Sequence, residues 1–172
     1  MPQDQDATAS APQLVGSFLE RRREQIAQRW ADASLFRSVF TVSRDEAVEA
    51  SKAVVDALSD VAVSGRLEDI TAPGYEPVRE QLGRMTQNRA RAGATPAGIA
   101  DEVAALRTPT LDLLREEFAD PTAPQAQECV LTLTLLLGTL RLVVLETALD
   151  ACAEMIGRQR QQLLEVATPV IK

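Results

Sequence analysis

The hydrophobic pattern is strongest in the last part of the chain, from Pro124 to about Val166. This segment has no proline after its first residue, and only Gly138 and Gly157 weaken its helical propensity. As an α-helix it would be about 60 Å long, at about 1.5 Å per residue. A domain of this size does not need such a length for its own core. The pattern therefore predicts one long helix that extends beyond the domain.

Apolar residues recur along this helix at alternating spacings of four and three residues, which is the spacing of a coiled coil. We call this line the heptad seam, and it consists of Leu131, Leu135, Gly138, Leu142, Leu145, Leu149, Cys152, Ile156, Gln159, Leu163 and Val166. A second apolar stripe lies on another face and consists of Val130, Leu133, Leu137, Leu140, Val144, Ala148, Ala151 and Met155. Beyond Met155 only the heptad seam continues.

A helix with two apolar faces is buried in its own domain, spans a membrane, or is shared between its domain and a partner. A membrane span needs roughly 20 mostly apolar residues. The densest run, Val130 to Leu145, is shorter and contains Arg141 and three threonines. We therefore expect no membrane span, and we predict a homodimer in which the second stripe packs in the core while the heptad seam meets a second copy.

Shorter helices precede the long one, and their start signals are clear. Ser43 followed by Glu46 forms a capping box, and Thr95 followed by Pro96 is typical of a helix start. Pro109 predicts a kink between residues 106 and 111, because proline lacks the amide donor that a helix uses. No segment alternates with a period of two, so we predict an all-α bundle of five to six helices. The shorter helices are expected at Ser10 to Ala33, Ser43 to Gly65, Pro77 to Gly93 and Thr95 to Asp120.

The ends of the chain differ from this helical pattern. Residues 1–10 are polar and without periodicity, so we expect a disordered tail. We expect a helical sensor domain at residues 11–155 and a helical linker at 156–168. Thr168 precedes Pro169, a position that disfavours helix, and Val170 and Ile171 favour a strand. Residues 169–172 are therefore predicted to begin a further domain.

Composition removes several classes of function. The chain of 172 residues has only 3% aromatic residues, which predicts an aliphatic core, and its net charge of −7 argues against nucleic acid as a partner. The Arg21-Arg22-Arg23 cluster is interpreted as a solvated helix face. The chain has no histidine, which excludes haem on a proximal histidine, zinc on imidazole and Ser-His-Asp catalysis. We expect no cofactor and no metal.

Cys129 and Cys152 are 23 residues apart on one predicted helix, which is about 34 Å, too far for a disulfide within the chain. Each is interpreted as a small buried hydrophobe. Cys152 lies on the heptad seam, so a disulfide or redox role across a dimer is the alternative. Two cysteines without a signal peptide indicate a reducing cytoplasm, which is the predicted location.

Two other functions have candidate residues. Trp30, Phe36 and Phe40 define a possible pocket for a small apolar ligand, with an ordinary aliphatic and aromatic core as the simpler interpretation. Acidic neighbours such as Glu116-Glu117 and Asp101-Glu102 point in different directions on a helix, so they do not form a paired-carboxylate site. The sequence contains no glycine-rich phosphate loop. We therefore predict that the chain is not an enzyme.

Three stretches resemble a known family. Gln162 to Ile171 is similar to the entry of a STAS domain, which typically reads Glu-Leu-Ser-Thr-Pro-Val-Ile. The first helix has its single tryptophan in Ile26 to Trp30, and Gly93 to Ile99 opens a further helix. Together these stretches resemble the RsbR-type co-antagonists of the bacterial stressosome, in the group with an RsbRD-like N-terminal domain. Only the C-terminal junction is a specific motif.

The resemblance implies a globin-like or related helical sensor domain that dimerises and binds no haem. It also implies a linker helix that leads into a STAS domain. That domain would assemble with an RsbS-type scaffold and hold an RsbT-type switch kinase, which controls a sigma-factor pathway. Family members are phosphorylated on threonines in the STAS domain and in some linkers, so Thr168 is a candidate phosphorylation site. Its structural role is to precede a proline at a strand start. Phosphorylation there would add about two negative charges.

Overall fold

The computed structural model describes residues 9–36 and 43–167, and within these ranges the chain folds into helices without a strand. The predicted all-α class is therefore confirmed. The helices within the described ranges are α1 (Ala11–Arg21), α2 (Arg23–Ala31), α3 (Arg44–Ser64), the 3₁₀ turn η1 (Pro73–Tyr75), α4 (Glu76–Arg91), α5 (Pro96–Ala104), α6 (Arg107–Glu116) and α7 (Pro124–Ala167).

Three short helices begin where the sequence placed a capping residue. Ser10 caps α1 in a reciprocal capping box with Gln13. The Ser43 hydroxyl accepts a hydrogen bond of 3.2 Å from the Glu46 amide, and the Thr95 hydroxyl accepts one of 3.1 Å from the Gly98 amide. Each cap satisfies an amide that has no partner inside its helix. These side chains therefore fix the starts of α1, α3 and α5.

The predicted first helix is two helices. Arg22 separates α1 from α2 with φ −98° and ψ 11°, outside helical geometry. This change of direction allows α1 to pack against α3 and α7, while α2 packs against α3 and α6. The prediction of one helix to Ala33 was wrong, because both halves carry apolar residues at helical spacing and the break needs neither glycine nor proline.

The predicted kink at Pro109 is a break that occurs earlier in the chain. Helix α5 ends at Ala104 and α6 begins at Arg107, so Pro109 lies in the first turn of α6. The first amides of a helix have no intrahelical acceptor, and proline therefore loses no hydrogen bond there. The proline is correctly associated with a discontinuity, although the chain turns three to four residues before it.

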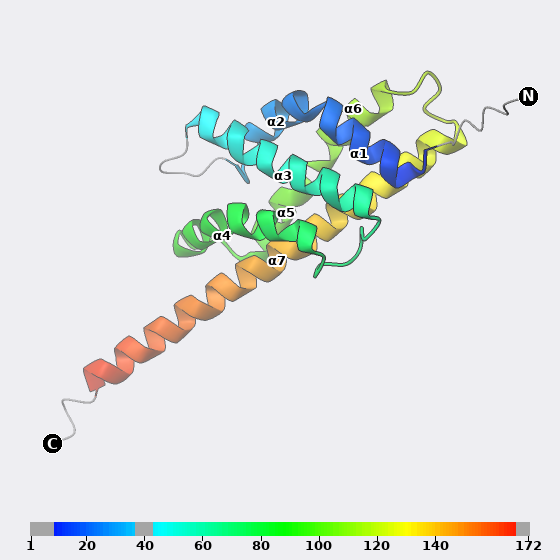
Figure 1. The fold of residues 1–172 in the computed structure, drawn as a ribbon. Helices are drawn as coiled ribbons and strands as arrows, with labels where there is room; N and C mark the ends of the chain where they lie inside the picture. The colour runs from blue at the N-terminus through cyan, green and yellow to red at the C-terminus, as the bar shows by residue number, and fades with distance from the viewer. Residues whose placement is uncertain (1–8, 37–42, 168–172) are drawn as a thin grey trace, which may run out of the picture.

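Helix α7 has 44 residues, about 66 Å at the usual rise, and the other helices pack along one side of its first half. Its most extensive contacts are with α4 and α5, and it also packs against α1 and α6 (Figure 1). The core is mainly aliphatic, as predicted, with Leu133, Leu136 and Leu140 of α7 at its centre. The C-terminal part of α7 projects away from the other helices (Figure 1).

Candidate functional site

Most positions of the heptad seam are exposed. The exposed fractions are 53% for Leu142, 53% for Leu149, 58% for Ile156 and 70% for Leu163. Leu131, Leu135 and Val166 are also exposed, whereas Leu145 and Cys152 are half-buried. Within the described residues, no other part of the chain covers the exposed leucines and Ile156 of this line. A row of large apolar residues on one helix face is typical of a surface that binds a partner.

Two seam positions are not large apolar residues. Gly138 is exposed, and a Cβ added to it would meet no heavy atom within 4 Å. The chain's own packing therefore does not require glycine at this position. Gln159 is exposed on the projecting part of α7. A polar residue in such a seam usually fixes the register between two helices and lowers their affinity.

The opposite face of α7 forms the core, and it is wider than the predicted second stripe. From that stripe, Leu133, Leu137, Leu140, Val144, Ala148 and Ala151 are buried, whereas Val130 and Met155 are half-buried. The structure also buries Ala126, Cys129, Thr132, Leu136, Thr139 and Val143. Burial of Thr132 and Thr139 was not predicted, because threonine is polar. The Thr139 hydroxyl donates to the Leu135 carbonyl at 3.0 Å, which allows it to be buried without loss of a hydrogen bond.

The two cysteines occupy different environments on α7. Cys129 is fully buried, which confirms its interpretation as a buried hydrophobe. Burial, with a smaller contribution from the Glu128 carboxylate, raises the pKa of its thiol. Cys152 is half-buried on the heptad seam, so it was wrong to interpret it as a fully buried residue. Only Cys152 combines partial exposure with a position on the seam.

The candidate apolar pocket lies in the described residues only in part. Trp30 and Phe36 are buried, and their rings stack with centroids 6.1 Å apart and an interplanar angle of 19°. The Trp30 indole N–H donates to Thr110 Oγ1 at 2.8 Å. These contacts are those of core residues, and binding of an apolar ligand stays a prediction. Phe40 and Thr168 lie outside the described residues.

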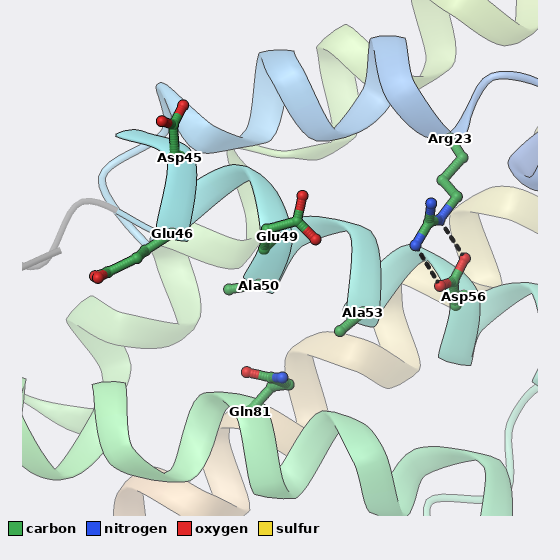
Figure 2. Close-up of a pocket in the computed structure, with 8 residues that line it drawn as sticks. All are labelled: Arg23, Asp45, Glu46, Glu49, Ala50, Ala53, Asp56 and Gln81. Atoms are coloured by element: carbon green, nitrogen blue, oxygen red, sulfur yellow. Dashed lines mark hydrogen bonds and ion pairs between the residues drawn. The ribbon is translucent and has the colours of Figure 1, made fainter. Parts of the chain in front are cut away.

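An open groove of about 570 Å³ lies between α3 and α4 (Figure 2). Ala50 and Ala53 of α3 point toward Gln81 of α4, and acidic residues of α3 line the rest. At one end, Arg23 donates two hydrogen bonds to Asp56, at 2.7 and 2.9 Å. The groove is an open, solvated surface with acidic walls. The groove was not predicted, because its lining residues come from three different helices.

The acidic pairs named from the sequence act as ion-pair partners. Asp101 binds Arg141 and Glu102 binds Arg89, so this pair diverges as predicted. Glu116 and Glu117 instead converge on one guanidinium, that of Arg22, because they lie at the end of α6. The geometry is that of a structural clamp between α6 and the α1–α2 junction.

The arginine cluster takes part in these contacts. Arg21 and Arg22 bind Glu117, and Arg23 binds Asp56. The side chains of Arg21, Arg22 and Arg23 are 57%, 25% and 41% exposed, so the cluster is solvated as predicted, and it forms ion pairs between helices as well. Burial alone would raise the pKa of Glu117, but the hydrogen bonds from Arg22 and Arg21 outweigh it, and the net pKa is lowered. The cluster fastens helices together within the domain.

Helix α7 is long and apolar enough to cross a membrane by length and composition, although half of its most apolar window is buried against the domain. Among residues 9–36 and 43–167, no group of three or more acidic or cysteine side chains is placed to hold a metal ion. No family model matches this chain, and neither a curated protein nor a solved structure matches it.

Proposed function

We propose that this chain is a non-catalytic, dimeric sensory and regulatory domain that relays a signal along α7. The observation that supports the proposal best is the heptad seam, which keeps its spacing from the helical body into the projecting part of α7. A helix needed only for the core would have a polar outer face. Here the outer face has leucines at coiled-coil spacing, which favours pairing with a second copy.

The arrangement of α7 suits the transmission of a signal. Its buried face contacts α1, α4, α5 and α6, so a change in their packing acts directly on α7. Its seam face would contact the second copy, and its projecting part would carry any rotation or shift away from the body. A relay requires such an element with two arrangements that an input can bias. Helices that slide or rotate against each other are one known form of such an element.

The resemblance to RsbR-type co-antagonists gives this proposal its cellular setting. In that setting the domain has a globin-like or related fold, and α7 leads to a STAS domain. The STAS domain binds an RsbS-type scaffold and controls an RsbT-type switch kinase in the cytoplasm. Two features support the setting: the all-α fold and the single long helix that leaves it. The candidate phosphorylation site in this setting is Thr168, the residue that follows Ala167 in the sequence.

Sedimentation equilibrium and amide hydrogen exchange together test the proposal. The wild-type chain should be a dimer at micromolar concentration, and the amides of residues 156–166 should be protected in the dimer. Leu149→Asp should lower the dimer fraction and also remove protection near Leu163, about 21 Å further along the helix. A chain that stays monomeric at high micromolar concentration would exclude dimerisation. Protection near Leu163 that survives loss of the dimer would exclude the relay along α7.

A further inference from the structure

Two charged residues flank the heptad seam where it crosses the helical body. Arg141 directly precedes Leu142, and Glu146 directly follows Leu145. These positions lie on opposite sides of the seam, because successive residues of an α-helix are about 100° apart. Their side chains are 49% and 47% exposed. Both are therefore available at the two edges of a helix pair formed along the seam.

Whether Arg141 of one copy lies close to Glu146 of the other depends on the relative direction of the two helices. Leu142 and Leu145 are seam positions three residues apart. In a parallel, in-register coiled coil, the residue directly before the first position of such a step lies beside the residue five positions later in the other chain. Arg141 then meets Glu146 of the second copy, and two-fold symmetry gives this contact twice. In an antiparallel pair, flanking residues of the same kind face each other, and Arg141 does not meet Glu146. The charges therefore specify a direction.

We propose that two copies of this chain pair in parallel and in register along the heptad seam, with Arg141 of each copy bound to Glu146 of the other. This inference rests on the dimer of the proposed function and adds its direction and register. The projecting part of α7 supports the same direction. In a parallel dimer Ile156 and Leu163 meet their own copies, whereas an antiparallel helix would bring each projecting part against the body of the other chain.

The same two residues hold α7 to its own body. Arg141 binds Asp101 of α5 at 3.0 Å, and Glu146 lies 3.7 Å from Arg79 of α4. For each side chain, an ion pair within its own chain therefore competes with an ion pair to the second copy. Helices α4 and α5 are the elements with the most extensive contacts to α7. A movement of either helix changes the balance between these ion pairs. The packing of α4 and α5 is thereby coupled to the affinity of the dimer.

Charge reversal measured by sedimentation equilibrium tests the contact between copies. Arg141→Glu and Glu146→Arg alone should each raise the dimer Kd about tenfold, because each replaces two attractive contacts with two repulsive ones. The double variant, Arg141→Glu with Glu146→Arg, should return the Kd to within about threefold of wild type. Asp150→Arg is the matched control, because it reverses the charge of an exposed residue of α7 that lies outside the seam. It should leave the dimer Kd unchanged.

Cys152 reports direction and register independently of these charges. In the parallel, in-register dimer it lies opposite its own copy on the seam. Copper phenanthroline, which accepts the two electrons while two thiols lose their protons, should therefore join the chains through Cys152. Cys152→Ser should abolish the covalent dimer, because Cys129 is fully buried. Oxidation of a proven dimer without this cross-link would overturn the parallel, in-register arrangement.

Asp101→Asn tests the competition between partners. It removes the charge that holds Arg141 within its own chain, and it should lower the dimer Kd by about threefold. A Kd that is unchanged or higher would overturn the competition. A monomeric wild-type chain would overturn the proposed function and this inference with it. A stable wild-type dimer would overturn this inference alone if the double variant raised the dimer Kd by the combined effect of the two single variants.

Discussion

The indole N–H of Trp30 on α2 donates a hydrogen bond of 2.8 Å to Thr110 Oγ1 on α6, and both residues are buried. The Thr110 hydroxyl in turn donates to the Leu106 carbonyl at 2.7 Å. Thr110→Val keeps the shape of the side chain but leaves the indole donor without its partner. We expect the free energy of unfolding to fall by about 1–3 kcal/mol.

Urea unfolding measures this loss, and Trp30 is its own probe because the chain has one tryptophan. Thr110→Ser is the matched control, since it retains the hydroxyl and loses only a methyl group. It should be the more stable of the two variants. Equal stability of the valine and serine variants would show that the hydrogen bond does not determine the stability of the α2–α6 contact.

Ile156→Asp tests the part of the heptad seam that lies beyond the body. Ile156 is 58% exposed in the single chain, so the substitution should change the unfolding of the monomer by less than about 0.5 kcal/mol. In the proposed dimer it places two carboxylates in an apolar contact, and the dimer Kd should rise at least about 100-fold. Analytical ultracentrifugation measures this change.

Leu164→Asp provides the comparison for this prediction. Leu164 is an exposed leucine of the same helix, 69% exposed, and it lies about 100° around the helix from the seam position Leu163. Its substitution should leave the dimer Kd within about threefold of wild type. If both substitutions weaken the dimer equally, the contact does not follow the heptad seam.

The sequence predicted the features that depend on local chemistry. Ser10, Ser43 and Thr95 were recognised as helix starts because a cap requires only a side-chain oxygen and an amide a few residues away. The two faces of α7 followed from spacing alone. The exposed face was found as a seam. The buried face was found in part, because the predicted stripe left out Leu136 and Val143 as well as the polar Thr132 and Thr139.

Features set by distant parts of the chain were not predictable in the same way. The break at Arg22 has no glycine or proline to mark it. It coincides with ion pairs from Arg22 to Glu116 and Glu117, more than ninety residues away. The acidic groove between α3 and α4 also combines residues separated in sequence. Such features depend on tertiary packing, which periodicity does not encode.

Glu117 predicts how stability depends on pH. Its folded pKa is lowered below the ordinary value by Arg22 and Arg21, despite an opposing contribution from burial. A lowered folded pKa gives stability that is present above the unfolded pKa and is lost as the pH falls through the folded pKa. Glu117→Gln should therefore cost about 1 kcal/mol at neutral pH. The difference from wild type should disappear in acid.

Urea unfolding of both proteins at a series of pH values measures this difference. Glu116→Gln is the control, because Glu116 is more exposed and its contact with Arg22 is longer, at 3.4 Å. Its effect should be smaller at every pH. A constant difference between Glu117→Gln and wild type across the series would mean that packing, and not the charge on Glu117, stabilises the α6 contact.

Gln159 is the polar position on the projecting part of the heptad seam, and its replacement distinguishes affinity from register. In the proposed dimer the two Gln159 side chains meet across the seam, where leucine would bury more apolar surface. Gln159→Leu should lower the dimer Kd by about tenfold. It should also admit other registers, because a buried polar residue in a coiled coil specifies alignment at a cost in stability. The yield of the Cys152 cross-link per dimer should therefore fall while the dimer becomes tighter.

Gln161→Leu is the matched control. Gln161 is also exposed and lies on the same helical turn, but it points away from the seam. It adds the same apolar side chain, and it should change neither the dimer Kd nor the cross-link yield. Tighter dimers from both variants would indicate unspecific association through added apolar surface. A tighter Gln159→Leu dimer with an unchanged cross-link yield would show that the register is set elsewhere, with the Arg141 and Glu146 contacts of the body as the nearest candidates.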